Sequence, residues 1–235
     1  MNSCQFGNSI SLFKYNLLSF LIAYSNDLEM FYIPMETEPK PKVRTPKYSP
    51  FEIGKSNEVL HQLMVEEYNK EYSDLCTIKS YFQNVGIQML MFEPSRAKRK
   101  YFNDGNRTEY FNQAINRYKS SAKSTVVVID PDVGSDVGIT RRYRSFKDRY
   151  VRKFELLKMK SNLKNGDFIC YYQSLADGNR SIHKRISSLR DWFGKWVILV
   201  SSKKIQASMV MLFNDKETFN EKRKLIEGYF KTTGQ

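Results

Sequence analysis

The stretch TVVVID spans residues 125–130 and runs directly into Pro131 and Asp132. Its consecutive β-branched residues predict a strand, and the absence of alternating polar residues indicates burial on both faces, as in parallel sheets. Open α/β sheets bind ligands just beyond the carboxyl ends of their strands. We therefore predict Asp130, Pro131 and Asp132 as catalytic residues. The alternative, that Asp130 caps a helix or accepts loop amides, stays open at this point.

Strands and helices alternate on both sides of this stretch. Further strands are predicted at 29–34, 87–92, 167–173, 196–201 and 207–213, and helices at 10–24, 57–72, 75–83, 109–120, 140–164, 180–193 and 216–230. This alternation favours a Rossmann-like, doubly wound α/β fold with a mostly parallel sheet and a C-terminal antiparallel hairpin. We expect one domain over residues 1–235, in which residues 39–84 form a basic loop and a helical insertion.

The composition indicates a polyanionic partner. The chain has 235 residues and a formal net charge of +13, which makes nucleic acid the expected partner. Three widely spaced cysteines predict neither a disulfide framework nor a zinc site, in keeping with a cytoplasmic protein. The apolar stretch at 10–24 contains Lys14 and is short for a membrane span, so no membrane association is expected. The oligomeric state has no signal in the sequence.

The most basic region is the predicted helix after the Asp-Pro-Asp turn. Residues 141–164 contain ten basic and two acidic side chains. Tyr150, Phe154 and Leu157 recur at helical spacing, which predicts an apolar face toward the sheet and a basic face toward phosphates. The predicted nucleic-acid-binding residues are Arg96, Lys98, Arg99, Lys100, Arg141, Arg142 and Arg144. A solvated basic surface without a ligand is the alternative.

Several short motifs resemble those of a known family. Gly7-Asn8, Lys14-Tyr15 and Leu17-Leu18 are similar to the opening of the large-subunit ribosomal-RNA adenine-N6 methyltransferases, where a Gly-Asn, a Lys-His pair and a leucine-rich helix precede the first strand. The chain also resembles uncharacterised bacterial proteins with Phe-Gly-Asp, Lys-Tyr, Asp-Pro-Asp-Asn-Gly and Tyr-Gln-His motifs. The last two correspond here to residues 130–134 and 172–174.

The resemblance implies S-adenosylmethionine as cofactor and a nucleic-acid substrate. Asp130 and Pro131 would stand where the family binds its target adenine, with a carboxylate and a backbone carbonyl accepting hydrogen bonds from the exocyclic amine. On the cofactor side the resemblance implies Gly7, Asn8 and Lys14, and the predicted cofactor-binding residues also include Glu36 and Glu93. Glu93 ends a strand and could bind a ribose as acids of dinucleotide-binding folds do, or it could be a solvated acid.

Two other functions remain open. Residues 34–38, after the first strand, contain no glycine for close approach to a nucleoside, which favours a non-catalytic nucleic-acid-binding protein on the same scaffold. Asp130, Asp132 and Asp136 could alternatively bind Mg²⁺, which prefers carboxylate oxygens, in a phosphoesterase or nuclease. Neither histidine, His61 or His183, has a partner at metal-ligand spacing, so no histidine-based metal site is predicted.

Overall fold

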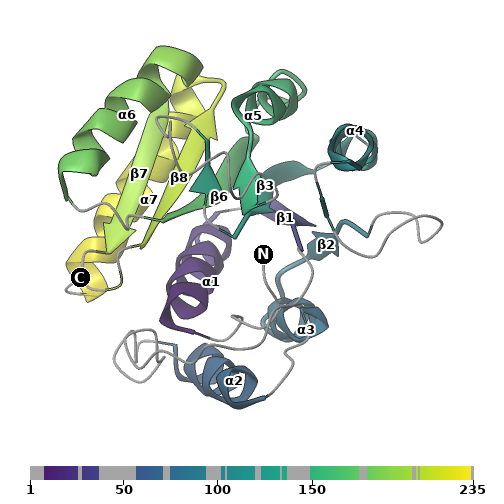
Figure 1. Ribbon diagram of the computed structural model, residues 1–235. Helices are drawn as coiled ribbons and strands as arrows, with labels where there is room; N and C mark the ends of the chain where they lie inside the picture. Colours follow the sequence, from purple (N-terminus) through teal and green to yellow (C-terminus); the bar gives the residue numbers. More distant parts are fainter. Residues whose placement is uncertain are drawn as a thin grey trace.

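The fold is built around one six-stranded mixed sheet (Figure 1). The computed structural model describes residues 8–25, 28–36, 57–70, 75–93, 102–103, 105–119, 123–132, 134–136, 149–174, 179–202, 205 and 207–233. The strands of this sheet are β1 (Leu28–Pro34), β2 (Met89–Met91), β3 (Ser124–Asp130), β6 (Phe168–Ser174), β7 (Val197–Ser202) and β8 (Ala207–Phe213). They are ordered β2-β1-β3-β6-β8-β7.

The sheet is parallel except for β8. Strand β1 pairs in parallel with β2 and β3, and β3 pairs in parallel with β6. Strand β8 is antiparallel to both of its neighbours, β6 and β7, and lies between them. The predicted α/β fold with a mostly parallel sheet and an antiparallel C-terminal hairpin is therefore confirmed. The hairpin folds so that β7 takes the edge position.

Helices cover both faces of the sheet. One face packs against α1 (Ser9–Ala23), α2 (Glu58–Asn69), α3 (Cys76–Asn84) and α7 (Lys216–Thr233), and the other against α4 (Arg107–Tyr118), α5 (Lys153–Lys160) and α6 (Asn179–Phe193). The sheet separates two hydrophobic cores, and the side chains of β3 alternate between them. Val126 and Val128 belong to the core on the α1 side, and Val127 and Ile129 belong to the core on the α4 side. Because strand side chains alternate between faces, Asp130 is directed to the α1 face.

Helix α1 is buried on nearly all sides. Asn8 caps it, since its side-chain oxygen accepts hydrogen bonds from the backbone N–H groups of Ile10 at 3.1 Å and Ser11 at 3.0 Å. The sequence predicts a single apolar stripe with Lys14 off that stripe. Instead Lys14 is only 6% exposed, because α1 lies between the sheet, α2 and α7. A lysine in this position needs a buried partner.

The predicted helix at 140–164 is wrong over much of its described part, which begins at residue 149. Tyr150–Val151 forms a short strand, β5, that pairs with β4 (Gly134–Ser135), and only Lys153–Lys160 is helical. Helix α5 starts where it does because the Glu155 carboxylate accepts the Arg152 backbone N–H at 2.7 Å. Residues 137–148 lie outside the described residues.

The predicted apolar face of that helix is also wrong. Leu156 and Met159 are buried under the sheet, whereas Phe154 is 50% exposed and Leu157 is 37% exposed. The predicted stripe assumed one continuous helix through Tyr150, and the strand at 150–151 breaks that periodicity. The aromatic side chain of Phe154 therefore faces outward.

The remaining differences concern the ends of elements. Strand β2 is shorter than the predicted strand at 87–92 and lies at the sheet edge, where Leu90 and Met91 are half-buried because only β1 pairs with it. Helices α2 and α3 fall within the predicted insertion at 39–84, of which residues 39–56 and 71–74 lie outside the described part. None of the described helices is long and apolar enough to cross a membrane.

Candidate functional site

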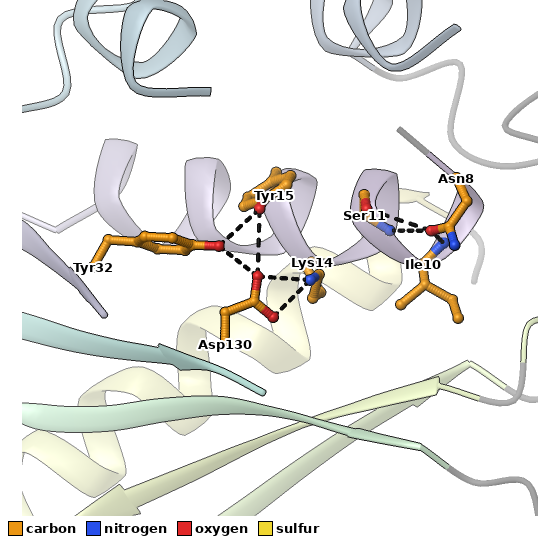
Figure 2. A network of polar contacts seen from close by, with 7 residues as sticks. All are labelled: Asn8, Ile10, Ser11, Lys14, Tyr15, Tyr32 and Asp130. Carbon is orange, nitrogen blue, oxygen red and sulfur yellow. Dashed lines mark hydrogen bonds and ion pairs between the residues drawn. The ribbon is translucent and has the colours of Figure 1, made fainter. Parts of the chain in front are cut away.

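The site is built around Asp130 at the carboxyl end of β3. The Asp130 cluster consists of Lys14, Tyr15, Tyr32 and Asp130 (Figure 2). The Lys14 ammonium donates to both carboxylate oxygens, with Nζ 2.8 Å from Oδ1 and 2.9 Å from Oδ2. The Tyr32 hydroxyl donates to Oδ2, and the Tyr15 hydroxyl lies 3.5 Å from the same oxygen and 3.0 Å from the Tyr32 hydroxyl.

The fold explains why residues 116 positions apart meet here. A short connection joins α1 to β1, so α1 runs back along the sheet and its first turns lie near the carboxyl edge of the parallel strands. Asp130 ends β3 at that edge, pairing in register with Pro34 of β1. Strand alternation places Asp130 and Tyr32 on the α1 face, where Asp130 meets Lys14 and the Tyr32 hydroxyl is directed at Asp130 and Tyr15 (Figure 2).

The cluster is almost closed to water. Asp130 is 2% exposed and both tyrosines are 0% exposed. Burial raises the pKa of Tyr32 and Tyr15 well above the usual tyrosine value, and the Asp130 charge adds to that rise. Both hydroxyls therefore stay protonated and act as donors to the carboxylate. The Lys14 ammonium also lies 5.4 Å from the ring centroid of Tyr172, where the aromatic face stabilises its charge.

The other carboxylates of the Asp-Pro-Asp region have partners of their own. Asp132 lies 3.8 Å from Arg149, with a side chain only 7% exposed. Asp136 accepts the backbone N–H of Lys153 at 2.8 Å, and burial raises its pKa. Within the described residues, no group of three or more His, Cys, Asp or Glu side chains is arranged to hold a metal ion. The Mg²⁺ alternative stays a prediction.

The structure brings together two motifs that lie far apart in the sequence. Gln173, at the end of β6, accepts hydrogen bonds from the backbone N–H of Ser135 at 2.9 Å and from its hydroxyl at 3.0 Å. Gly134 has φ +127° and packs so closely that a Cβ would lie 2.5 Å from Gln173 Nε2. Only glycine fits there. Gln173 thus holds the chain just after the Asp-Pro-Asp turn.

Sequence reasoning missed Tyr15, Tyr32 and Gln173 as members of this region. Tyr32 carries a weak signal, because a tyrosine in a strand buried on both faces needs a partner for its hydroxyl. Gln173 carries a clearer one, since it is a polar residue that follows a buried run just before the carboxyl end of a strand. Neither signal identifies the residue with which the Tyr32 hydroxyl or the Gln173 amide pairs.

The residues predicted for the cofactor lie in several different places. Asn8 caps α1, Lys14 binds Asp130, Glu36 is half-buried beside β1, and Glu93 is exposed just beyond β2. Glu93 also belongs to the lining of a groove of about 780 Å³ along β2, together with Lys79 and Arg117. Gly7 lies outside the described residues.

Backbone groups after β1 are already used within the protein. Pro34 has no N–H, and its carbonyl accepts the Tyr110 hydroxyl. The N–H of Met35 donates to the Asp130 carbonyl at 3.3 Å, and the Glu36 carbonyl accepts from Phe102 at 2.8 Å. A nucleoside cofactor needs free donors or close backbone approach here, whereas the Pro34 and Glu36 carbonyls and the Met35 N–H already pair within the protein. Residues 37 and 38 of the predicted loop lie outside the described residues.

The residues predicted to bind nucleic acid, Arg96, Lys98, Arg99, Lys100, Arg141, Arg142 and Arg144, lie outside the described residues. No protein-family model matches this chain, and neither curated proteins nor solved structures yielded a match. The resemblance to adenine-N6 methyltransferases therefore stays a prediction.

Proposed function

We propose that this chain is a nucleic-acid-binding protein on a methyltransferase-like α/β scaffold, in which Asp130 is an internal anchor. The observation that carries the proposal is the Lys14–Asp130 pair, because it joins the two motif regions on which the resemblance rests. The mostly parallel α/β sheet is compatible with such a scaffold, and this fold-level similarity carries no information about function.

The geometry of Asp130 favours binding without methyl transfer. An exocyclic amine would have to share a carboxylate that already accepts hydrogen bonds from Lys14 on both oxygens and from Tyr32 on one of them. The carboxylate is 2% exposed, so a base would have to displace a buried ammonium to reach it. The described residues after β1 support the same conclusion, since the Pro34 and Glu36 carbonyls and the Met35 N–H are engaged within the protein.

Charge supports nucleic acid as the partner. The formal net charge of +13 is large for 235 residues, and basic side chains that approach phosphates release counterions from the nucleic acid. Arg149 brings part of this charge close to the Asp-Pro-Asp turn. Arg152 and Lys153 lie at the beginning of α5, and Lys158 lies in its last turn. A fold of this charge concentrates polyanions at its surface.

Methyl transfer is the second candidate, favoured by Glu93. This carboxylate is exposed beyond the end of β2, where acids of dinucleotide-binding folds accept hydrogen bonds from ribose hydroxyls. If the cofactor binds, S-adenosylmethionine would supply the methyl group, and Glu93 would hold its ribose.

Two titrations separate the candidates. Binding of a fluorescein-labelled 20-nucleotide strand should weaken steeply as salt rises, and no binding at 50 mM salt would refute the leading proposal. Calorimetry with millimolar S-adenosylmethionine should detect no binding. Detectable binding that is lost in Glu93→Gln, but kept in the nearby control Lys79→Gln, would instead establish the second candidate.

The arginines predicted from the sequence have their own test. Replacing Arg141, Arg142 and Arg144 together by alanine should weaken binding and reduce the slope of affinity against salt by up to about 3, roughly one unit for each phosphate contact. A wild-type slope in the triple variant would show that these side chains are only solvated.

A further inference from the structure

An unusual group of exposed side chains lies on the outer surface of α5 and the end of α6. Phe154 is 50% exposed, Leu157 is 37% exposed and Trp192 is 44% exposed. The α5–α6 surface is defined here by Arg152, Lys153, Phe154, Leu157, Lys158 and Trp192. Because Leu156 and Met159 face the sheet, Phe154 and Leu157 occupy the opposite, outward side of α5.

Basic groups stand beside each aromatic ring of this surface. The Arg152 guanidinium lies 5.9 Å from the centroid of the Phe154 ring, and the Lys153 ammonium lies over the Trp192 ring. Lys153 therefore bridges α5 to α6, while Lys158 on the other flank donates to Asn112 of α4. Each of the two exposed rings thus has a basic side chain beside it, on two neighbouring helices.

Glu155, the one acidic residue of α5, does not reduce the positive charge of this surface. Glu155 is 1% exposed and points inward, where it pairs with Arg107 at 2.7 Å. With this carboxylate neutralised in the interior, the outward side of α5 presents only apolar and positively charged groups. A surface of this kind attracts polyanions that also carry flat apolar rings.

We propose that the α5–α6 surface binds unpaired nucleic acid, with bases stacked on Trp192 and Phe154 and phosphates beside Arg152, Lys153 and Lys158. The proposal rests on the nucleic-acid half of the proposed function and names its substrate class as single-stranded. Only an unpaired base exposes the ring face that an aromatic side chain needs for stacking. A protein partner fits less well, because the cores of protein interfaces are depleted of lysine.

The position of this surface connects it with the site at the sheet edge. Arg149, which lies 3.8 Å from Asp132, is separated by only two residues from Arg152, where the surface begins. A strand bound along α5 would therefore have one end near the Asp-Pro-Asp turn. The buried Asp130 cluster itself lies on the opposite, α1 face of the sheet.

The test compares single-stranded with duplex probes. Fluorescence anisotropy would measure binding of labelled 12-nucleotide oligo-dT and oligo-U and of a duplex, at fixed salt, to the full chain. Trp192→Ala and Phe154→Ala should each weaken single-strand binding about tenfold, and duplex binding less than about twofold. Trp192→Phe should recover most of the lost affinity, because it keeps a stacking ring. Tyr24→Ala, at an aromatic side chain that is 65% exposed on α1, is the matched control and should bind as the wild type does.

Each other outcome overturns the inference. Wild-type single-strand affinity in both alanine variants would exclude stacking, and equal losses for single strand and duplex would show that the rings do not recognise unpaired bases. A change from oligomer to monomer in Trp192→Ala, with oligonucleotide binding unaltered, would make the surface a contact between copies of the chain. If the wild type binds no nucleic acid, the proposed function falls as well; if it binds but Trp192 is irrelevant, only this inference falls.

Discussion

Replacing Asp130 by asparagine tests whether the Asp130 cluster is an anchor of the fold. The substitution keeps the shape of the side chain but removes its charge, and it leaves the Lys14 ammonium, only 6% exposed, without a counterion. Breaking a buried ion pair by removing one partner costs about 3–5 kcal/mol. For a chain of this size each kcal/mol lowers the melting temperature by roughly 2–4 °C, so we expect a decrease of about 6–20 °C.

The assay is a double-mutant cycle, in which the free energy of unfolding of each variant is measured by urea denaturation and the melting temperature by calorimetry. Asp130→Asn and Lys14→Met should each be strongly destabilising, whereas the double variant should lose less than the sum, because neither charge is then left uncompensated. Arg223→Met is the control: its partner Glu227 lies 2.9 Å away, but both side chains are more than half exposed, and such pairs contribute about 0–1 kcal/mol.

Two results would refute the reasoning. One is a melting temperature of Asp130→Asn within about 2 °C of the wild type, which is less than the cost of one uncompensated buried charge allows. The other is full additivity in the cycle, which would mean that Lys14 and Asp130 do not stabilise each other. Either result would leave Asp130 available to a ligand and would favour the catalytic candidate.

Three further predictions follow from single contacts. Gly134→Ala should destabilise the protein by clearly more than Gly86→Ala, because both glycines have positive φ but only at Gly134 would a Cβ meet another side chain, at 2.5 Å; urea midpoints compare the two. The tyrosines of the Asp130 cluster have raised pKa values, so their contribution is complete below about pH 10 and is lost as the pH rises through their folded values. Unfolding measured from pH 8 to 11 should show this fall, and Tyr32→Phe should flatten it; an unchanged profile would contradict the assignment. Arg107→Met should lower the free energy of unfolding by about 3–5 kcal/mol, because it leaves the buried Glu155 carboxylate without its cationic partner. A loss under about 1 kcal/mol in urea unfolding would show that the Arg107–Glu155 pair is dispensable.

The local pattern predicted most of the sheet but not all of its boundaries. The run at 125–130 and the apolar runs near the C-terminus are strands because their β-branched and aromatic residues suit a buried sheet, whatever their neighbours. The predicted helix at 140–164 is wrong because the conformation of its described part depends on a neighbour that is distant in the sequence. Tyr150 and Val151 pair with β4, and that pairing partner lies too far along the chain to be visible in local periodicity.

The sequence by itself determined the α/β class, the burial of β3 on both faces and the position of Asp130 at a carboxyl strand end. It also determined the excess of positive charge, since composition and continuous apolar runs can be read from the sequence without knowledge of the fold. Only the tertiary structure decided what those residues do. Lys14 reaches Asp130 across 116 positions, Gln173 holds the chain at Gly134, and Phe154 turns outward beside Trp192. These outcomes depend on which helix faces cover which strand ends, and a buried charge or an exposed ring acquires its role only from neighbours that distant segments supply.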